Sequence, residues 1–151
     1  MKQDYPALLD PGLKNMDLAG LEDLCVTSFS NNARRRQIWE RFILFLDRLS
    51  STGLDYEIWI DGSFVTEKEA PSDVDVVVFH DPPEVNRLSA NRKATLDLLF
   101  MDRQVTKLRY HTDAFFIPND DPDARMYWRG CFGYDHYDNP KGIVRLDLRT
   151  P

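Results

Sequence analysis

The stretch from Ile58 to His80, IWIDGSFVTEKEAPSDVDVVVFH, constrains the fold most, because it places two aspartates beside a run of valines. Apolar runs bounded by polar loops predict buried strands at residues 56–60 and 74–79, yet aspartate is depleted from strands. Side chains two residues apart in a strand share a face, so Asp73 and Asp75 should project side by side. The valines at 74, 76 and 78 should then face the other way and be buried.

This pair of carboxylates predicts a cation site. Adjacent carboxylates repel each other unless a cation lies between them, and Mg²⁺ commonly uses one or two carboxylates together with substrate phosphates. Gly62 and Ser63 precede the pair; a glycine lets backbone approach a ligand, and turn N–H groups with a serine hydroxyl suit phosphate oxygens. The alternative is structural, with Asp73 ending the loop and Asp75 in an edge-strand salt bridge. The apolar run that follows argues against an edge.

The remaining pattern predicts an α/β (α+β) fold, in which helices pack on a small mixed sheet within one domain of 151 residues. Asp17 should cap a helix that ends at Phe29, and Asn31 or Asn32 should cap a longer helix stopped by Gly53. The other expected segments are an extended surface arm at 1–16, two helices within 84–110, a strand at 112–118, a helix at 122–132 with Gly133 just past its end, and a hairpin at 134–148.

Composition and charge exclude some classes of function. A net charge of −6 argues against nonspecific coating of nucleic acid. No apolar run approaches the roughly 20 residues of a membrane span, and the N-terminus lacks the apolar core of a signal peptide, so we expect a cytoplasmic protein. Cys25 and Cys131 should be free thiols. The arginines at 34–36 should form a solvated helix face, with a phosphate or RNA contact as the alternative.

The order of strand, Gly62–Ser63, nine residues, and Asp73-Val-Asp75 in the next strand resembles the signature of the nucleotidyltransferase superfamily, the fold of DNA polymerase beta. Over most of its length the chain is similar to small uncharacterised bacterial nucleotidyltransferase-like proteins, including minimal nucleotidyltransferases of toxin–antitoxin modules. The resemblance implies transfer of a nucleoside monophosphate, by analogy AMP, from an NTP to an acceptor hydroxyl. It also implies that Asp73 and Asp75 hold two Mg²⁺ (or Mn²⁺) ions while Gly62 and Ser63 bind the triphosphate.

The resemblance further implies a third carboxylate that binds the metal activating the acceptor. Asp113 is the favoured residue, because it is an acid on the otherwise apolar strand face of Phe115 and Ile117. Asp147 is the rival, although Arg145 on the same strand face gives it a simple solvated partner.

The chain departs from the family pattern around the Gly-Ser pair. Asp61 precedes the pair, where many members have an apolar residue, and we expect it to bond nearby backbone N–H groups or, as the alternative, to join the metal site. The arginine that often follows the pair is missing, and Lys68 is the nearest cation and the candidate phosphate contact.

Three functions are therefore possible. The first is a nucleotidyltransferase. We expect a chain of this length to lack the added helical domain of larger relatives, so the acceptor or a partner chain would have to complete the pocket of such an enzyme. We expect that acceptor to be a protein, such as a toxin or effector, or an RNA end. The second function is a binding module without turnover, acting as an antitoxin or regulatory partner, which the missing arginine favours. The third is RNA binding by the basic helix, with steep salt dependence.

Overall fold

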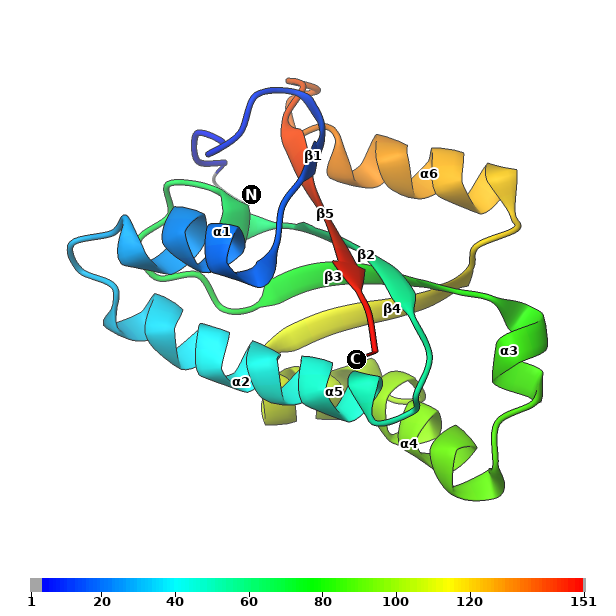
Figure 1. Cartoon of the computed structure of the whole chain (residues 1–151). Helices are drawn as coiled ribbons and strands as arrows, with labels where there is room; N and C mark the ends of the chain where they lie inside the picture. Colours follow the sequence, from blue (N-terminus) through cyan, green and yellow to red (C-terminus); the bar gives the residue numbers. More distant parts are fainter. Residues whose placement is uncertain (1–3, 151) are drawn as a thin grey trace.

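The computed structural model of the protein describes residues 4–150, and a mixed sheet of five strands forms the centre of this region (Figure 1). The strand order is β1-β5-β2-β3-β4. β2 is antiparallel to both β3 and β5, whereas β3 and β4 are parallel, as are β1 and β5. The predicted mixed α/β class is confirmed. The strands are β1 (Gly12–Asn15), β2 (Tyr56–Asp61), β3 (Val74–His80), β4 (Thr112–Pro118) and β5 (Gly142–Leu148).

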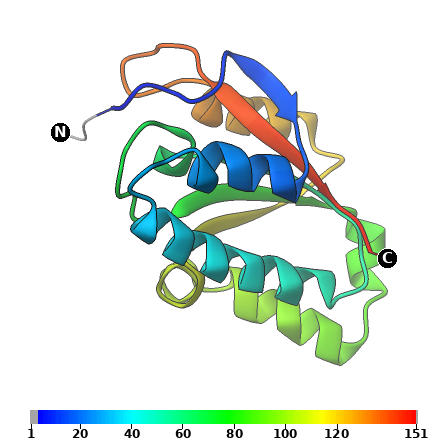
Figure 2. The same ribbon diagram turned by 60° about the vertical axis from the view of Figure 1, so that its left-hand side comes forward.

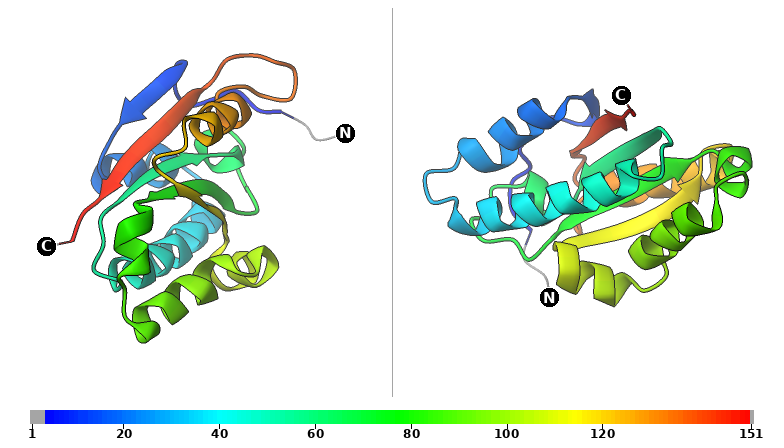
Figure 3. Two further views of the ribbon diagram at one scale, coloured as in Figure 1. Left: turned by 90° about the vertical axis from the view of Figure 1, so that its right-hand side faces the viewer. Right: turned by 60° about the horizontal axis from the view of Figure 1, so that its bottom comes forward.

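Helices cover the sheet unequally. Most of them lie on one face, whereas α6 (Pro122–Phe132) packs on the other (Figure 3). The first group comprises α1 (Leu18–Glu22), the π-helical turn η1 (Asp23–Thr27), α2 (Ala33–Ser50), α4 (Ala90–Phe100) and α5 (Arg103–Tyr110). A short helix, α3 (Pro82–Asn86), follows β3. Within residues 4–150, no helix combines the length and the apolar character needed to cross a bilayer.

Strand β3 is buried on both faces, as its run of valines requires. Val74, Val76 and Val78 belong to the large core under the helices, and Val77 and Phe79 belong to a smaller core under α6. The prediction that the valines opposite Asp73 and Asp75 are buried is therefore confirmed. Because β3 lies between β2 and β4, the edge-strand alternative is wrong.

Several local helix signals are confirmed, but Asn32 makes no capping side-chain hydrogen bond at the start of α2, and the helix expected to reach Phe29 is α1 followed by η1, which ends at Thr27. Asp17 accepts a hydrogen bond from the Gly20 N–H at the start of α1, and Asp121 accepts one from the Ala124 N–H at the start of α6. α2 ends at Ser50, and Gly53 follows with a φ of +79°. The region 84–110 contains the two expected helices, α4 and α5, after the short α3.

Predictions for the two ends of the chain are wrong. The hairpin at 134–148 does not form: residues 134–140 make a turn closed by one bridge between Tyr134 and Pro140, and β5 pairs with β2 and β1. The expected surface arm contributes β1 to the sheet beside β5 (Figure 2), and residues 1–3 lie outside the described region. Pairing between distant segments leaves no periodic signal in either of them.

Candidate functional site

The Gly62–Ser63 turn leads from β2 into the one-turn helix η2 (Ser63–Val65). Gly62 has a φ of +83°, a conformation that residues with a side chain rarely adopt. A Cβ atom placed on Gly62 would lie 2.1 Å from Oδ2 of Asp75. Glycine is therefore required both for the turn and for the close approach of its backbone to the Asp75 carboxylate.

Three aspartates form a row across neighbouring strands. Asp61 on β2 pairs with Asp75 on β3, and Asp75 pairs with Asp113 on β4. Residues directly opposite each other project to the same face, with Cβ atoms roughly 5 Å apart. Asp73 stands just before β3, two residues from Asp75, and so projects to this face as well. The fold thus gathers carboxylates from three strands at one end of the sheet.

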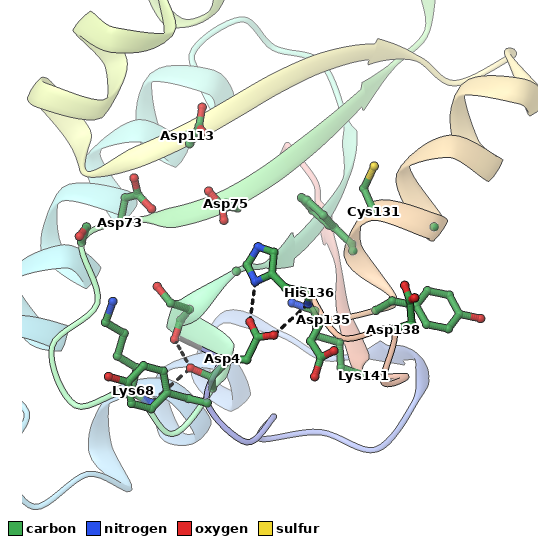
Figure 4. Close-up of a pocket in the computed structure, with 18 of the residues that line it drawn as sticks. Asp4, Lys68, Asp73, Asp75, Asp113, Cys131, Asp135, His136, Asp138 and Lys141 are labelled. Carbon is green, nitrogen blue, oxygen red and sulfur yellow. Dashed lines mark hydrogen bonds and ion pairs between the residues drawn. The ribbon is translucent and has the colours of Figure 1, made fainter. Parts of the chain in front are cut away.

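These strand ends border a cavity of about 700 Å³ (Figure 4). Asp4 and His136, which are joined by a 2.6 Å contact between Oδ1 and Nδ1, line it from the opposite side. Among residues 4–150, six aspartates and three lysines line the cavity, so its net negative charge favours a ligand that carries positive charge. All the sequence-predicted site residues take part in the lining: Gly62, Ser63, Lys68, Asp73, Asp75 and Asp113.

Two cations from α5 hold Asp113. Arg103 donates through Nε to Oδ1 and through Nη2 to Oδ2, both at 2.9 Å, in the bidentate geometry that fixes a carboxylate firmly. These hydrogen bonds raise the pKa of Arg103. Lys107, one helical turn later, places its Nζ 3.8 Å from Oδ2 of both Asp73 and Asp113. Asp113 therefore lies in the cavity but is already paired.

Whether these residues can hold a divalent cation depends on the oxygen atoms that a bound phosphate-bearing ligand adds to the site. In the described part of the chain, no group of three or more His, Cys, Asp and Glu side chains is arranged to hold a metal ion. The oxygens of Asp73 and Asp75 are nevertheless the donor type that Mg²⁺ prefers, and Mg²⁺ sites with one or two carboxylates take their other ligands from phosphates and water. The residues fit an ion that arrives with a phosphate-bearing ligand.

Asp61 is almost fully buried, at 1% exposed. Its Oδ1 accepts the Gly62 N–H at 2.9 Å and lies 3.3 Å from Nζ of Lys141, while its buried Oδ2 has no hydrogen-bond partner among the described residues. Burial raises the pKa of Asp61 to about 7, against the opposing effect of Lys141. The expected bond to a turn N–H is confirmed. The contact with Lys141 was not predicted, because no local pattern links the two positions.

Arg35 shows that the predicted solvated face of the arginine run is wrong. Its guanidinium is completely buried and donates to four backbone carbonyls at 2.6–2.8 Å. Desolvation lowers its pKa. The carbonyls belong to Cys25, Phe64, Thr66 and Lys68, so Arg35 ties the loop after Gly62–Ser63 to η1.

A sequence signal for Arg35 was present. It continues the apolar stripe of α2, because it precedes Ile38 by three residues and Phe42 by seven. Its neighbours are engaged within the chain as well: Arg34 donates to the carbonyls of Pro71 and Ser72, and Arg36 forms an ion pair with Glu22.

Asp147 and Lys68, two further residues considered for the site, lie in different parts of the structure. Asp147 lies on β5, opposite Glu57, where it pairs with Arg145 and Arg149 and lines a separate groove. Asp113, and not Asp147, therefore neighbours Asp73 and Asp75. Lys68 lines the cavity, with its Nζ 5.7 Å from the centre of the Tyr5 ring.

Comparison with known proteins finds one informative match. A family model described as a family of unknown function (DUF6932) matches residues 1–147. No curated protein matches the chain, and no solved structure matches it. Any function assigned to the cavity therefore depends on the chemistry of its own side chains.

Proposed function

The chain belongs to the DUF6932 family of unknown function, and we propose that it is a divalent-metal-dependent nucleotidyltransferase. It transfers a nucleoside monophosphate, by superfamily analogy AMP, from an NTP to a hydroxyl of a protein or RNA acceptor. The acceptor oxygen bonds to the α-phosphorus while the bond from that phosphorus to the α,β-bridging oxygen breaks, so pyrophosphate leaves and the hydroxyl proton is released to solvent. One observation carries the proposal: the Gly62 turn packs against Asp75 in a cavity that Asp73 and Asp113 also line. A polyphosphate and its cation can touch turn and carboxylates together in this arrangement.

Each residue has a distinct role in this proposal. Asp73 and Asp75 hold the metal, and the backbone and hydroxyl of Ser63 bind phosphate oxygens beside Gly62. Mg²⁺ or Mn²⁺ bound there neutralises phosphate charge and lowers the pKa of the acceptor hydroxyl. Asp113 is the third ligand, and it takes that role when Arg103 releases its carboxylate.

The acceptor and the location of the protein are also part of the proposal. Among residues 4–150, the far side of the cavity is formed by the N-terminal segment, α6 and the turn before β5. We propose that the acceptor itself, or a partner such as a toxin or effector, completes the pocket in the cytoplasm. An RNA end is the other acceptor to test.

The experiment combines purified protein, NTPs labelled at the α-phosphate, Mg²⁺ or Mn²⁺, and cell extract. Label should appear on a macromolecule with the wild type and disappear with Asp75→Asn, which removes a metal ligand but keeps the shape of the side chain. Asp147→Asn is the matched control, because Asp147 lies outside the cavity, and it should keep full transfer. Equal labelling with all three proteins would refute the proposal.

A specific observation favours a second candidate function. Because Arg103 already holds both oxygens of Asp113, the same fold could bind a partner without turnover, as an antitoxin or regulator. This alternative predicts no label transfer under any condition, together with a stoichiometric partner that copurifies with the protein.

A further inference from the structure

Lys141 is the lysine held most closely to the Gly62–Ser63 turn. Its Nζ lies 3.3 Å from Oδ1 of Asp61, the same oxygen that accepts the Gly62 N–H at 2.9 Å. Oδ1 of Asp61 therefore contacts both the ammonium group of Lys141 and the first N–H of the turn. The side chain of Lys141 is only 16% exposed, yet it lines the cavity.

The backbone around Lys141 is also firmly held. Its N–H donates to the carbonyl of Gly133 at 2.8 Å, and the next residue begins β5. A Cβ on Gly142 would lie 2.4 Å from the carbonyl oxygen of Asp10, so the strand passes close against the N-terminal segment. Lys141 is thus presented to the cavity by a rigid element.

Stability alone explains this ion pair poorly. Burying two charges costs several kcal/mol for each ion unless further hydrogen bonds satisfy their remaining donors and acceptors. Here the second oxygen of Asp61 has no hydrogen-bond partner in the described residues. An ammonium group has three donors, and among residues 4–150 Lys141 forms one ion pair, with Asp61, which leaves donors for a ligand.

We propose that Lys141 is the cation that binds the phosphate tail of the ligand at the Gly62–Ser63 turn, and that Asp61 is its positioning residue. This inference rests on the proposed function and names its phosphate-binding cation. Residues 61–67 contain no lysine or arginine, so the turn needs a cation from elsewhere in the chain. Lys107 lies 3.8 Å from Asp73 and Asp113, and Lys68 lies toward Tyr5, whereas Lys141 contacts the Asp61 oxygen that also accepts the Gly62 N–H.

The test is calorimetric titration with inorganic tripolyphosphate, with and without Mg²⁺, at low ionic strength. Lys141→Met should weaken binding by about 10- to 100-fold, the effect of losing hydrogen bonds to a charged donor. Lys141→Arg should retain most of the affinity because it keeps the charge. Lys93→Met, at an exposed position on α4, is the matched control and should bind like the wild type.

A second measurement needs no variant, so it holds even if Lys141→Met does not fold. Tripolyphosphate should protect Lys141 of the wild-type protein from an acetylating reagent, as read by mass spectrometry, and should leave Lys93 reactive. Equal reactivity of Lys141 with and without tripolyphosphate would overturn the inference, as would binding lost in Lys68→Met but not in Lys141→Met.

The inference and the proposed function fail in distinguishable ways. Mg²⁺-dependent binding that Asp75→Asn abolishes and Lys141→Met leaves intact overturns the role of Lys141 alone. Binding that needs Lys141 but ignores both Mg²⁺ and Asp75→Asn supports the anion site and removes the metal from the proposed function. No tripolyphosphate binding by the wild type overturns the inference, whereas label transfer tests the proposed function separately.

Discussion

Between pH 5 and pH 8 the wild type should lose stability relative to an Asp61→Asn variant, although Asp61 lies beside Lys141. Burial raises the pKa of Asp61 from an ordinary 3.8 to about 7. The carboxyl group therefore ionises near pH 4 in the unfolded chain but keeps its proton up to about pH 7 in the folded protein. The folded state binds more protons between these values, so the free energy of unfolding falls as the pH rises through this window.

The size of the effect follows from the width of the window. One pKa unit corresponds to about 1.4 kcal/mol. Between pH 5 and pH 7, ionisation of Asp61 therefore removes about 3 kcal/mol of stability, and above pH 7 it removes little more. Asparagine does not titrate, so relative to the Asp61→Asn variant the wild type should lose about 3 kcal/mol between pH 5 and pH 8.

Urea unfolding of both proteins at pH 5, 6, 7 and 8 measures this difference. Burial lowers the pKa of His80 and His111, which gives an opposite pH dependence, but both histidines are present in both proteins and cancel. Asp147→Asn, at a partly exposed position on β5, is the control and should show no such trend. If the difference in the free energy of unfolding between wild type and Asp61→Asn is the same at pH 5 and pH 8, the reasoning is refuted, because Lys141 then keeps Asp61 ionised throughout.

Three other substitutions test the site. Gly62→Ala should destabilise the protein by about 1–3 kcal/mol and weaken Mn²⁺ binding, because φ is +83° and the new Cβ would meet Asp75; unfolding and Mn²⁺ titration measure both effects. Arg35→Met should lower the free energy of unfolding by about 4 kcal/mol, since it leaves four buried carbonyls without their donor, and an unchanged urea midpoint would contradict this. Lys107→Gln should tighten Mn²⁺ binding by about tenfold at low salt, because it removes a charge close to the carboxylates; the exposed Arg109→Gln on the same helix should not.

Sequence patterns predicted those parts of the site that depend on local order. The alternation of side chains along a strand predicted that Asp73 and Asp75 share one face and that the valines lie on the other. Asp113 was predicted because it is the one acid on an otherwise apolar strand face. The Gly62–Ser63 turn could be predicted from two adjacent residues alone. Each of these predictions uses residues within one strand or one turn, where backbone geometry alone decides which side chains share a face.

The sequence patterns did not predict which basic residues pair with these acids. Arg103 and Lys107 are two of the six basic residues within 84–110, and the spacing of these residues does not show which of them reaches Asp113. Lys141 meets Asp61 because β5 pairs with β2, a long-range contact without a local pattern. Arg35 could have been found, since it continues the apolar stripe of α2, but a run of three arginines suggested a solvated surface.

The row of Asp61, Asp75 and Asp113 is the strongest physical reason to regard the cavity as functional. Like charges directly opposite each other in a sheet are destabilising, and this row places an acid opposite an acid twice, with both pairs charged once Asp61 ionises above about pH 7. The fold places a cation at each end, Lys141 beside Asp61 and Arg103 beside Asp113. Apolar side chains, which fill most of these strands, would be at least as stable in such positions. Asp75 and Asp113, the two members of the row that line the cavity, therefore favour a ligand that brings positive charge with it.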